Sequence, residues 1–241
     1  MSFYLSIYRL LPGFLKRRIN PLEYAIEVFV RSANPTENSV VLDAGAGETR
    51  FRKYFLDHHY VALDSRVGDT RWDYSCIDVC GDLAAIPLAA DSVDRVINVQ
   101  VLEHVPDPKT VLTEFYRVLK PEGRLYLTVP QGWHEHQQPN DYFRFTRYAL
   151  RSLLNSTGFK EISVDPLGGY FQYLGQRMTY VPKVLFEGHR GARRLMLFPL
   201  ELGLLFLCCF VAPLFCYYLD LLDHKREFTL CYRCLAVKQR G

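Results

Sequence analysis

Two glycines that follow a buried strand form a pattern with clear chemical potential. Residues 39–51, SVVLDAGAGETRF, are typical of a strand that ends at Asp43 and is followed by a turn carrying Gly45 and Gly47. Glycine suits such a turn because a ligand can then approach the backbone closely, whereas a β-carbon would block it. The pattern predicts the start of a nucleotide-binding βαβ unit.

The acid after the next strand and the spacing of the glycines indicate the kind of nucleotide. Asp64 ends a strand predicted over residues 60–64 and is placed to accept hydrogen bonds from a ribose diol. A dinucleotide-binding fingerprint, G-x-G-x-x-G, requires a third glycine where this chain has Arg50. The run VVLDAGAG instead resembles the first motif of class I S-adenosylmethionine (SAM) dependent methyltransferases, with Thr49 where that motif usually has its third glycine.

Further segments resemble the same family, in the right order and at the right distances. By this resemblance, residues 80–107 supply Asp82, which would accept from the adenine amino group, and Leu83, which would lie against the ring. The strand predicted over 93–99 would end beside the methionine portion of the cofactor. The resemblance covers residues 37–166 and is to type 11-like methyltransferases. It implies SAM as cofactor, bound by Asp43, Gly45, Ala46, Gly47, Asp64, Asp82, Leu83 and Val99.

Alternating strand and helix patterns must position these side chains. Strands are predicted over residues 39–43, 60–64, 74–79, 93–99, 124–129 and 160–164, and helices over 49–58, 108–120 and 147–156. Helices between successive strands imply a parallel sheet with right-handed crossovers. Residues 228–237 resemble the final antiparallel strand of the family. The resemblance implies an α/β fold: a Rossmann-like, seven-stranded class I methyltransferase sheet with helices on both faces and an apolar helical insertion between the last two strands.

Histidines gather where the fourth and fifth predicted strands end. Glu103 and His104 follow the fourth strand, and residues 130–146 follow the fifth. The carboxyl ends of the strands are where open α/β sheets bind their ligands. The second segment resembles an H-x-x-P-x-D-Y-x-R-x-T pattern of some of these methyltransferases, filled here by His136, Pro139, Asp141, Tyr142, Arg144 and Thr146.

Methyl transfer from a sulfonium is an in-line displacement, and holding the acceptor close and in line supplies much of the rate. A base helps where an acceptor hydroxyl must lose its proton. We predict catalytic or acceptor contacts from His136, His104, Asp141 and Tyr142. Two alternatives stay open: His104 can be a structural loop residue, and Asp141 can pair with Arg144 merely to fix the loop.

An apolar segment near the carboxyl end favours membrane association. Residues 202–219 contain 18 residues without a charge, the lower limit for a bilayer span. The final strand must lie on the side of the catalytic domain, yet residues 195–222 are too short for two spans. We therefore predict a shallow helical hairpin, broken near Pro213 and inserted from one side. A helix buried in a soluble core is the alternative.

Charges flank this apolar segment asymmetrically, and the amino terminus is amphipathic. The basic flank would face the cytoplasmic leaflet. The amino-terminal residues could form a lid over the cofactor or lie at an anionic membrane surface. The flanking charges are Lys183, Arg190, Arg193 and Arg194 before the segment and Asp220 and Asp223 after it; the amino-terminal apolar residues are Phe3, Ile7, Leu11, Phe14 and Leu15, followed by Lys16, Arg17 and Arg18.

Charge and cysteine spacing argue against two other kinds of site. A net charge of +3 without a basic run does not favour a nucleic-acid partner. The resemblance implies that Cys76 and Cys80 lie far from Cys231 and Cys234, near opposite edges of the sheet, so we expect no four-thiolate zinc site. We predict no metal site. Reduced thiols fit the cytoplasmic side of a membrane.

These interpretations give four parts and one leading function. The parts are residues 1–36, an amphipathic or lid segment; 37–166, the SAM-binding core; 167–227, the insertion with its membrane-associated hairpin; and 228–241, the final strand. We predict a SAM-dependent methyltransferase, peripheral or monotopic at the inner face of the membrane, that methylates a lipid or lipid-linked glycan. One alternative is a soluble small-molecule methyltransferase that uses the insertion as an acceptor pocket or dimer interface. An alternative of another class is a non-catalytic SAM-binding scaffold.

Overall fold

The chain forms two compact units. The sheet unit comprises Ile26–Asp165 and Cys231–Gly241, and the helical unit comprises Met1–Ala25 and Pro166–Leu230. The computed structural model describes residues 8, 10–69, 71–188 and 191–240, with the backbone alone for residues 191–195. The helical unit therefore interrupts the sheet unit in sequence, between its last two strands.

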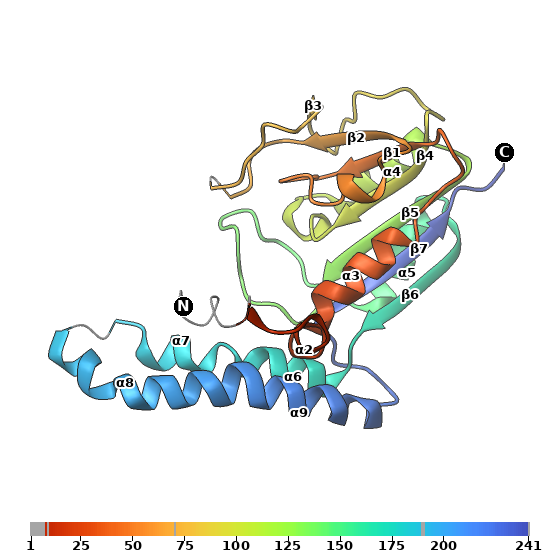
Figure 1. Ribbon diagram of the computed structural model, residues 1–241. Helices are drawn as coiled ribbons and strands as arrows, with labels where there is room; N and C mark the ends of the chain where they lie inside the picture. Colours follow the sequence, from red (N-terminus) through yellow and green to blue (C-terminus); the bar gives the residue numbers. More distant parts are fainter. Residues whose placement is uncertain (1–7, 9, 70, 189–190, 241) are drawn as a thin grey trace. The chain divides into compact units, whose positions relative to one another are not determined.

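The sheet unit is built on a seven-stranded sheet with strand order β3-β2-β1-β4-β5-β7-β6 (Figure 1). The neighbours from β3 to β5 pair in parallel, and β7 runs antiparallel to β5. This confirms the predicted fold class. The strands are β1 (Val40–Ala44), β2 (His59–Asp64), β3 (Val79–Cys80), β4 (Val93–Val99), β5 (Leu119–Pro130), β6 (Lys160–Leu167) and β7 (Cys231–Val237).

Helices cover both faces of this sheet. On one face, Leu125 and Leu127 of β5 belong to a buried cluster that includes Phe115 and Leu150 from two helices. Side chains alternate along a strand, so Tyr126 points to the other face, where its ring centroid lies 5.3 Å from that of Phe29. The helices concerned are α4 (Pro108–Val118) and α5 (Arg147–Ser156) on the first face and α3 (Pro21–Arg31) on the second.

Two predicted elements of the sheet unit are wrong in extent. In place of a helix over 49–58 there is only a 3-10 turn, Arg52–Tyr54, because Thr49 takes a left-handed conformation with φ 53° that cannot start a right-handed helix. The strand predicted over 74–79 is limited to β3. The Asp78 backbone N–H still donates to the Ala62 carbonyl at 3.0 Å, but the Ala62 N–H donates to the Asp78 side chain, at 2.8 Å, and not to a backbone carbonyl.

The helical unit is a hairpin of helices. The helices α6 and α9 pack together, as do α7 and α8, and α2 packs on α9 (Figure 1). A β-carbon on Gly175 would lie 2.9 Å from Cβ of Cys216, so the glycine allows α6 and α9 to approach closely. The helices are α2 (Gly13–Ile19), α6 (Tyr170–Met178), α7 (Val181–Phe186), α8 (Gly191–Phe206) and α9 (Ala212–Leu219).

The apolar helix continues through Pro213, so the predicted break there is wrong. A π turn, Leu207–Val211, joins α8 to α9, and a 3-10 turn, Asp220–Leu222, ends the run. Pro213 lies at the start of α9, directly after the wider π turn, which accommodates a residue without an N–H donor. Met196–Leu222 forms one apolar helix of 27 residues. The reversal of the chain lies between α7 and α8 instead.

Two acids at the end of this helix fix the base of the hairpin. The Asp220 carboxylate, which is buried, accepts from the backbone N–H groups of Gly169 at 3.0 Å and Gln172 at 2.9 Å. Asp223 accepts from Tyr170 N–H at 2.7 Å. Both carboxylates thus satisfy the free N–H groups at the start of α6, where negative charge is favourable.

The amino-terminal segment is described in part. Phe3 and Ile7 lie outside the described residues. In the described part, α2 ends with three basic residues, and the Arg18 guanidinium lies 5.9 Å from the centroid of the Tyr218 ring in α9. Of the basic flank, Arg190 lies outside the described residues, and the side chains of Arg193 and Arg194 are not described.

Candidate active site

A cavity of about 650 Å³ opens at the carboxyl ends of β1, β2 and β4 in the sheet unit. Its lining includes every residue that the sequence predicted for the cofactor: Asp43, Gly45, Ala46, Gly47, Asp64, Asp82, Leu83 and Val99. Three of the four predicted catalytic residues, His104, His136 and Tyr142, line the same cavity. The structure therefore brings the two predicted sets together, while Asp141 lies behind the lining.

The glycine turn has the backbone that its sequence predicted. Gly45 and Gly47 have φ values of 82° and 50°, in the left-handed region that favours glycine. A β-carbon on Gly45 would lie 2.5 Å from Cγ2 of Val101. The N–H groups of Gly45 and Ala46 both donate to the Leu63 carbonyl, at 2.8 and 3.1 Å, which ties the turn to β2.

Asp64 holds the turn as well as facing the cavity. Its Oδ2 accepts from Gly47 N–H at 2.9 Å, and its Oδ1 accepts from Arg66 N–H at 2.6 Å. Each carboxylate oxygen has a second lone pair that can accept from a ribose hydroxyl. At the other side, the carboxylate of Asp82 accepts from Ala84 N–H at 2.9 Å, and Leu83 is buried beside it.

Asp43 lies buried at the end of β1. Its carboxylate accepts a hydrogen bond from the Tyr60 hydroxyl. Burial raises the pKa of Asp43 from 3.8 to about 6, partly offset by the Tyr60 hydrogen bond and by the charge of Arg50. A buried carboxylate in this position can receive a cationic ligand, since a nearby positive charge would favour the ionised form.

The other end of the cavity is formed by the loops after β4 and β5. His104 lies in the 3-10 turn Leu102–His104, and its Nδ1 lies 2.6 Å from the Asn140 carbonyl oxygen. A carbonyl only accepts, so Nδ1 carries the proton and Nε2 carries the lone pair. Burial lowers the pKa of His104 and favours this neutral form. His104 therefore makes a structural loop contact through Nδ1, as the alternative interpretation expected, while its Nε2 lone pair is free to act on a ligand.

Asp141 and Arg144 hold the second loop together. The guanidinium donates to both carboxylate oxygens of Asp141 at 2.7 Å, and it also donates to the carbonyls of Trp133 and His134. Asp141 in turn accepts from His136 N–H at 2.8 Å. The Arg144 hydrogen bonds lower the pKa of Asp141 to about 2. Asp141 therefore positions His136 and is not itself exposed to an acceptor.

Tyr142 and several residues without a motif complete the lining. The Tyr142 hydroxyl donates to Oδ1 of Asn140 at 3.1 Å. Trp72, Trp133 and Asn140 also line the cavity. They lie in irregular loops, where neither periodicity nor spacing predicts which side chains turn inward, and the sequence carried no signal for Trp72.

The candidate site also has a fully buried carboxyl group next to His104. Glu103 is 0% exposed, and burial raises its pKa to about 8. Its backbone carbonyl accepts from Tyr142 N–H at 2.9 Å, which joins the β4 and β5 loops. Glu103 lies at the strand end where the sequence predicts it, but its complete burial has no sequence signature.

The cysteine pairs are separated as predicted from the resemblance. Cys80 lies in β3 at one edge of the sheet, whereas Cys231 and Cys234 lie in β7. The strands β2, β1, β4 and β5 lie between them in the sheet order. The two pairs therefore cannot form a four-thiolate site.

Sequence comparisons locate a known domain in the chain. Residues 42–127 match the family described as "Methyltransferase domain". A probable S-adenosylmethionine-dependent methyltransferase of Mycolicibacterium smegmatis is 35% identical over 145 residues, which are 55% of this chain and 56% of that protein. A ubiquinone biosynthesis O-methyltransferase of Idiomarina loihiensis is 29% identical over 41% of this chain and 48% of its own length. The chain spans about half the length of these curated relatives.

Structure comparison gives the same fold. A SAM-dependent methyltransferase from Archaeoglobus fulgidus superposes with a TM-score of 0.55 at 13% identity, covering 93% of this chain and 99% of that one. The likeness is one of fold. The predicted resemblance to class I SAM-dependent methyltransferases is confirmed, with the methyltransferase domain match over residues 42–127 and a probable SAM-dependent methyltransferase among the relatives.

Proposed function

We propose that this methyltransferase lies at the cytoplasmic face of a membrane and transfers the SAM methyl group to a lipid or lipid-linked glycan. The supporting observation is an exposed apolar stripe along the helical unit. One relative is named as a ubiquinone biosynthesis O-methyltransferase. The acceptor atom would sit beside His104 and His136, the two histidines that line the cavity.

The apolar stripe runs along most of the 27-residue helix. Its members are all exposed large apolar side chains: Phe198, Leu202, Phe206, Val211, Phe215, Tyr218 and Leu222. Only 22% of the most apolar part of this helix is buried, so the helix is not a core helix. Soluble proteins rarely expose a continuous apolar surface of this length, and such surfaces mark partner or membrane contacts.

The opposite side of the same helix is occupied within the helical unit. Cys208, Cys209, Pro213 and Cys216 are buried, and Gly175 of α6 is close to the last two. One side of the helix therefore packs on α6, and the other side carries the stripe. We infer that this helix lies along the membrane surface, with the stripe toward the lipid and the other side on α6.

The chain topology supports lying in the interface over crossing the membrane. The helical unit leaves the sheet after β6 and returns to it at β7, so both ends of the hairpin are on one side. A crossing would carry the exposed charges Lys183 and Glu187, near the hairpin turn, through the hydrocarbon. An in-plane helix leaves them in water.

The test is to incubate the full chain with methyl-labelled SAM and a whole-cell extract and to partition the products between organic and aqueous phases. Label in the organic phase is expected. Label only in the aqueous phase would overturn the lipid acceptor and favour a small-molecule methyltransferase that uses the stripe as a dimer interface. No transfer to any extract component, together with intact SAM binding, would favour a non-catalytic scaffold.

A further inference from the structure

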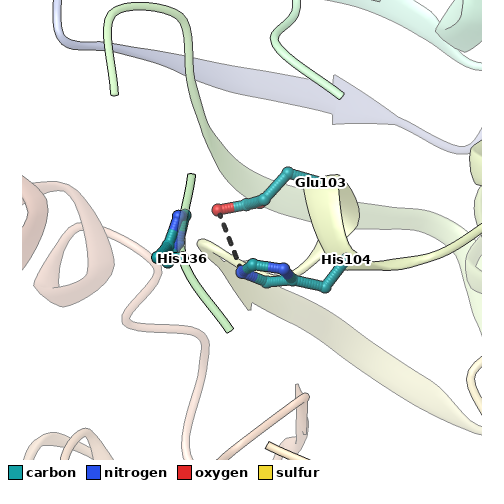
Figure 2. Close-up of side chains that lie close together, drawn as sticks. All are labelled: Glu103, His104 and His136. Atoms are coloured by element: carbon teal, nitrogen blue, oxygen red, sulfur yellow. Dashed lines mark ion pairs between the residues drawn. The ribbon is translucent and has the colours of Figure 1, made fainter. Parts of the chain in front are cut away.

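Three side chains at the acceptor end of the cavity face one another. Among the described residues, Glu103, His104 and His136 each offer one ligand atom, and these atoms lie within 4.8 Å of one another. Figure 2 shows the Glu103 carboxylate directed at the His104 ring, with His136 beside them on the neighbouring loop. Oε1 of Glu103 and Nε2 of His104 are 3.8 Å apart, too far for a hydrogen bond. The space between these groups is shared by three potential ligand atoms.

Glu103 is short of a partner in this arrangement. Its side chain is 0% exposed, and neither carboxylate oxygen has a hydrogen-bond partner among the described residues. Nε2 of His104 is also buried and has no partner among these residues. Buried polar groups are nearly always paired, because an unpaired one loses its hydration without compensation. The three orphaned atoms point to a ligand that bonds all of them.

The hydrogen bonds around the cluster prepare both imidazoles for such a ligand. Nδ1 of His104 donates to the Asn140 carbonyl at 2.6 Å, and Nδ1 of His136 lies 3.1 Å from the His134 carbonyl. Because a carbonyl only accepts, His104 carries its proton on Nδ1 and leaves the Nε2 lone pair available. For His136 the His134 carbonyl, at 3.1 Å, is closer to Nδ1 than the Arg144 donor at 3.5 Å, which favours the same tautomer. Metal-binding histidines are typically oriented in this way by a second hydrogen bond.

A positively charged group, the Arg144 guanidinium, lies close to the cluster, and the Asp141 carboxylate balances its charge. A guanidinium nitrogen of Arg144 lies 3.5 Å from Nδ1 of His136. The same guanidinium donates to both oxygens of Asp141 at 2.7 Å, so the pair is neutral overall. The carboxyl group of Glu103 then remains as the acidic group of the cluster that is not paired with a cation.

We propose that Glu103, His104 and His136 bind a divalent transition-metal ion of the zinc type. Two imidazole nitrogens and one carboxylate oxygen are a donor set that such ions accept, and three protein ligands leave a position open. His104 and His136 line the cavity, so an acceptor held in the cavity would be next to such an ion. This donor set is distinct from the cysteine pairs, which the sheet keeps apart.

The metal gives the acceptor site a chemical preference. An acceptor hydroxyl bound at the open position becomes more acidic, and its proton passes to solvent water. The oxygen then forms the new bond to the SAM methyl carbon while the carbon–sulfur bond breaks, and sulfur keeps the electron pair as a thioether. This acceptor role rests on the proposed methyl transfer, whereas metal binding itself does not.

Metal binding can be measured without SAM or acceptor. The full chain is stripped with a chelator, then titrated with Co²⁺, whose visible absorption reports imidazole and carboxylate ligation, and with Zn²⁺ by calorimetry. We expect one ion per chain. Glu103→Gln and His136→Asn should each weaken binding by about tenfold or more, since loss of a direct ligand costs at least as much as loss of an outer partner.

Matched controls separate this site from incidental binding. His59→Asn removes an exposed histidine, and Cys76→Ser with Cys80→Ser removes the exposed thiols. These variants should bind the metal as the unaltered chain does. The inference is overturned if the unaltered chain binds no stoichiometric ion, or if the control variants lose binding while Glu103→Gln, checked for folding by circular dichroism, retains it. Stoichiometric binding at the cluster without any methylated lipid would sink the proposed acceptor and leave the metal site standing.

Discussion

The carboxylate of Asp64 accepts a hydrogen bond of 2.9 Å from the backbone N–H of Gly47, so the acid that ends β2 also shapes the turn after β1. The two halves of the predicted nucleotide site are therefore one hydrogen-bonded structure. We therefore expect Asp64 to act on the cofactor both through its free lone pairs and through the turn it holds.

Replacement of this acid should weaken cofactor binding. For Asp64→Ala we expect a loss of about 1.5 to 3 kcal/mol in affinity for S-adenosylhomocysteine, the range for a hydrogen bond to a charged group. Calorimetric titration measures it, and thermal unfolding of the variant shows whether the turn has also loosened. Equal affinity in the variant would remove Asp64 from the site.

The hairpin should respond to a single methyl group at its closest crossing. Gly175→Ala places a β-carbon 2.9 Å from Cβ of Cys216 and 3.1 Å from Cα of Pro213, so we expect a loss of about 1 to 3 kcal/mol in the free energy of unfolding. Gly203→Ala is the matched control, since its β-carbon meets no described atom within 4 Å. That variant should be neutral or up to about 1 kcal/mol more stable, as helical alanine is favoured over glycine. Urea unfolding followed by circular dichroism compares the two, and equal behaviour would mean that α6 and α9 are not in close contact.

The stability of the sheet unit should depend on pH through Asp43. Its folded pKa of about 6 lies above the ordinary 3.8, so folding favours the protonated form. This contribution is complete below about pH 3.8 and is lost as the pH rises through about 6, a change on the order of 3 kcal/mol for a buried group. Asp43→Asn lacks the titration and can still accept from Tyr60. The variant should therefore gain stability relative to the unaltered chain between pH 4 and pH 7.5.

Chemical unfolding of both proteins at these two pH values measures the difference, in the absence of cofactor. A pH-independent difference between them would show that Asp43 is ionised without cost in the folded chain. Tyr60→Phe serves as a second variant, because loss of the donor should raise the pKa of Asp43 further and widen the difference.

The apolar stripe should govern binding to vesicles. Phe206 and Phe215 are 63% and 64% exposed, and Phe206→Ser with Phe215→Ser should lower binding to vesicles containing anionic phospholipid by about tenfold or more, from the apolar area no longer buried. Tyr148→Ser, at a 78% exposed aromatic residue of α5, is the control and should bind as the unaltered chain does. Flotation with the vesicles gives the bound fraction. Unchanged flotation of the double variant would assign the stripe to a protein contact.

The elements with strong local patterns could be predicted from sequence, and the irregular ones could not. The helix Arg147–Ser156 has the predicted bounds because Thr146 caps it and Gly158 follows it. The helix expected after Gly47 fails because Thr49 takes a left-handed backbone, which depends on the turn around it and not on helix propensity. A proline is easily seen in a sequence, whereas a π turn has no comparable sequence signature. The sequence therefore predicted a break at Pro213, where the helix instead continues through a wider turn.

The same distinction between local pattern and tertiary packing applies to the candidate site. Motif spacing placed His104 and His136 at one sheet edge, because the ends of parallel strands meet there. The complete burial of Glu103 depends on tertiary packing, which no local sequence pattern encodes.

The π turn also determines how the exposed side chains before and after it are aligned along the apolar helix. Consecutive residues of an α-helix are about 100° apart around its axis, so one surplus residue would rotate everything beyond it by that angle. The stripe crosses the turn with a step of five, from Phe206 to Val211, and keeps steps of three or four elsewhere. The turn absorbs the surplus residue. If Leu207–Val211 were regular α-helix with all five residues kept, the two halves of the stripe would face different directions. In such a regular helix, deletion of one residue within Leu207–Val211 would restore the alignment of Phe206 with Phe215.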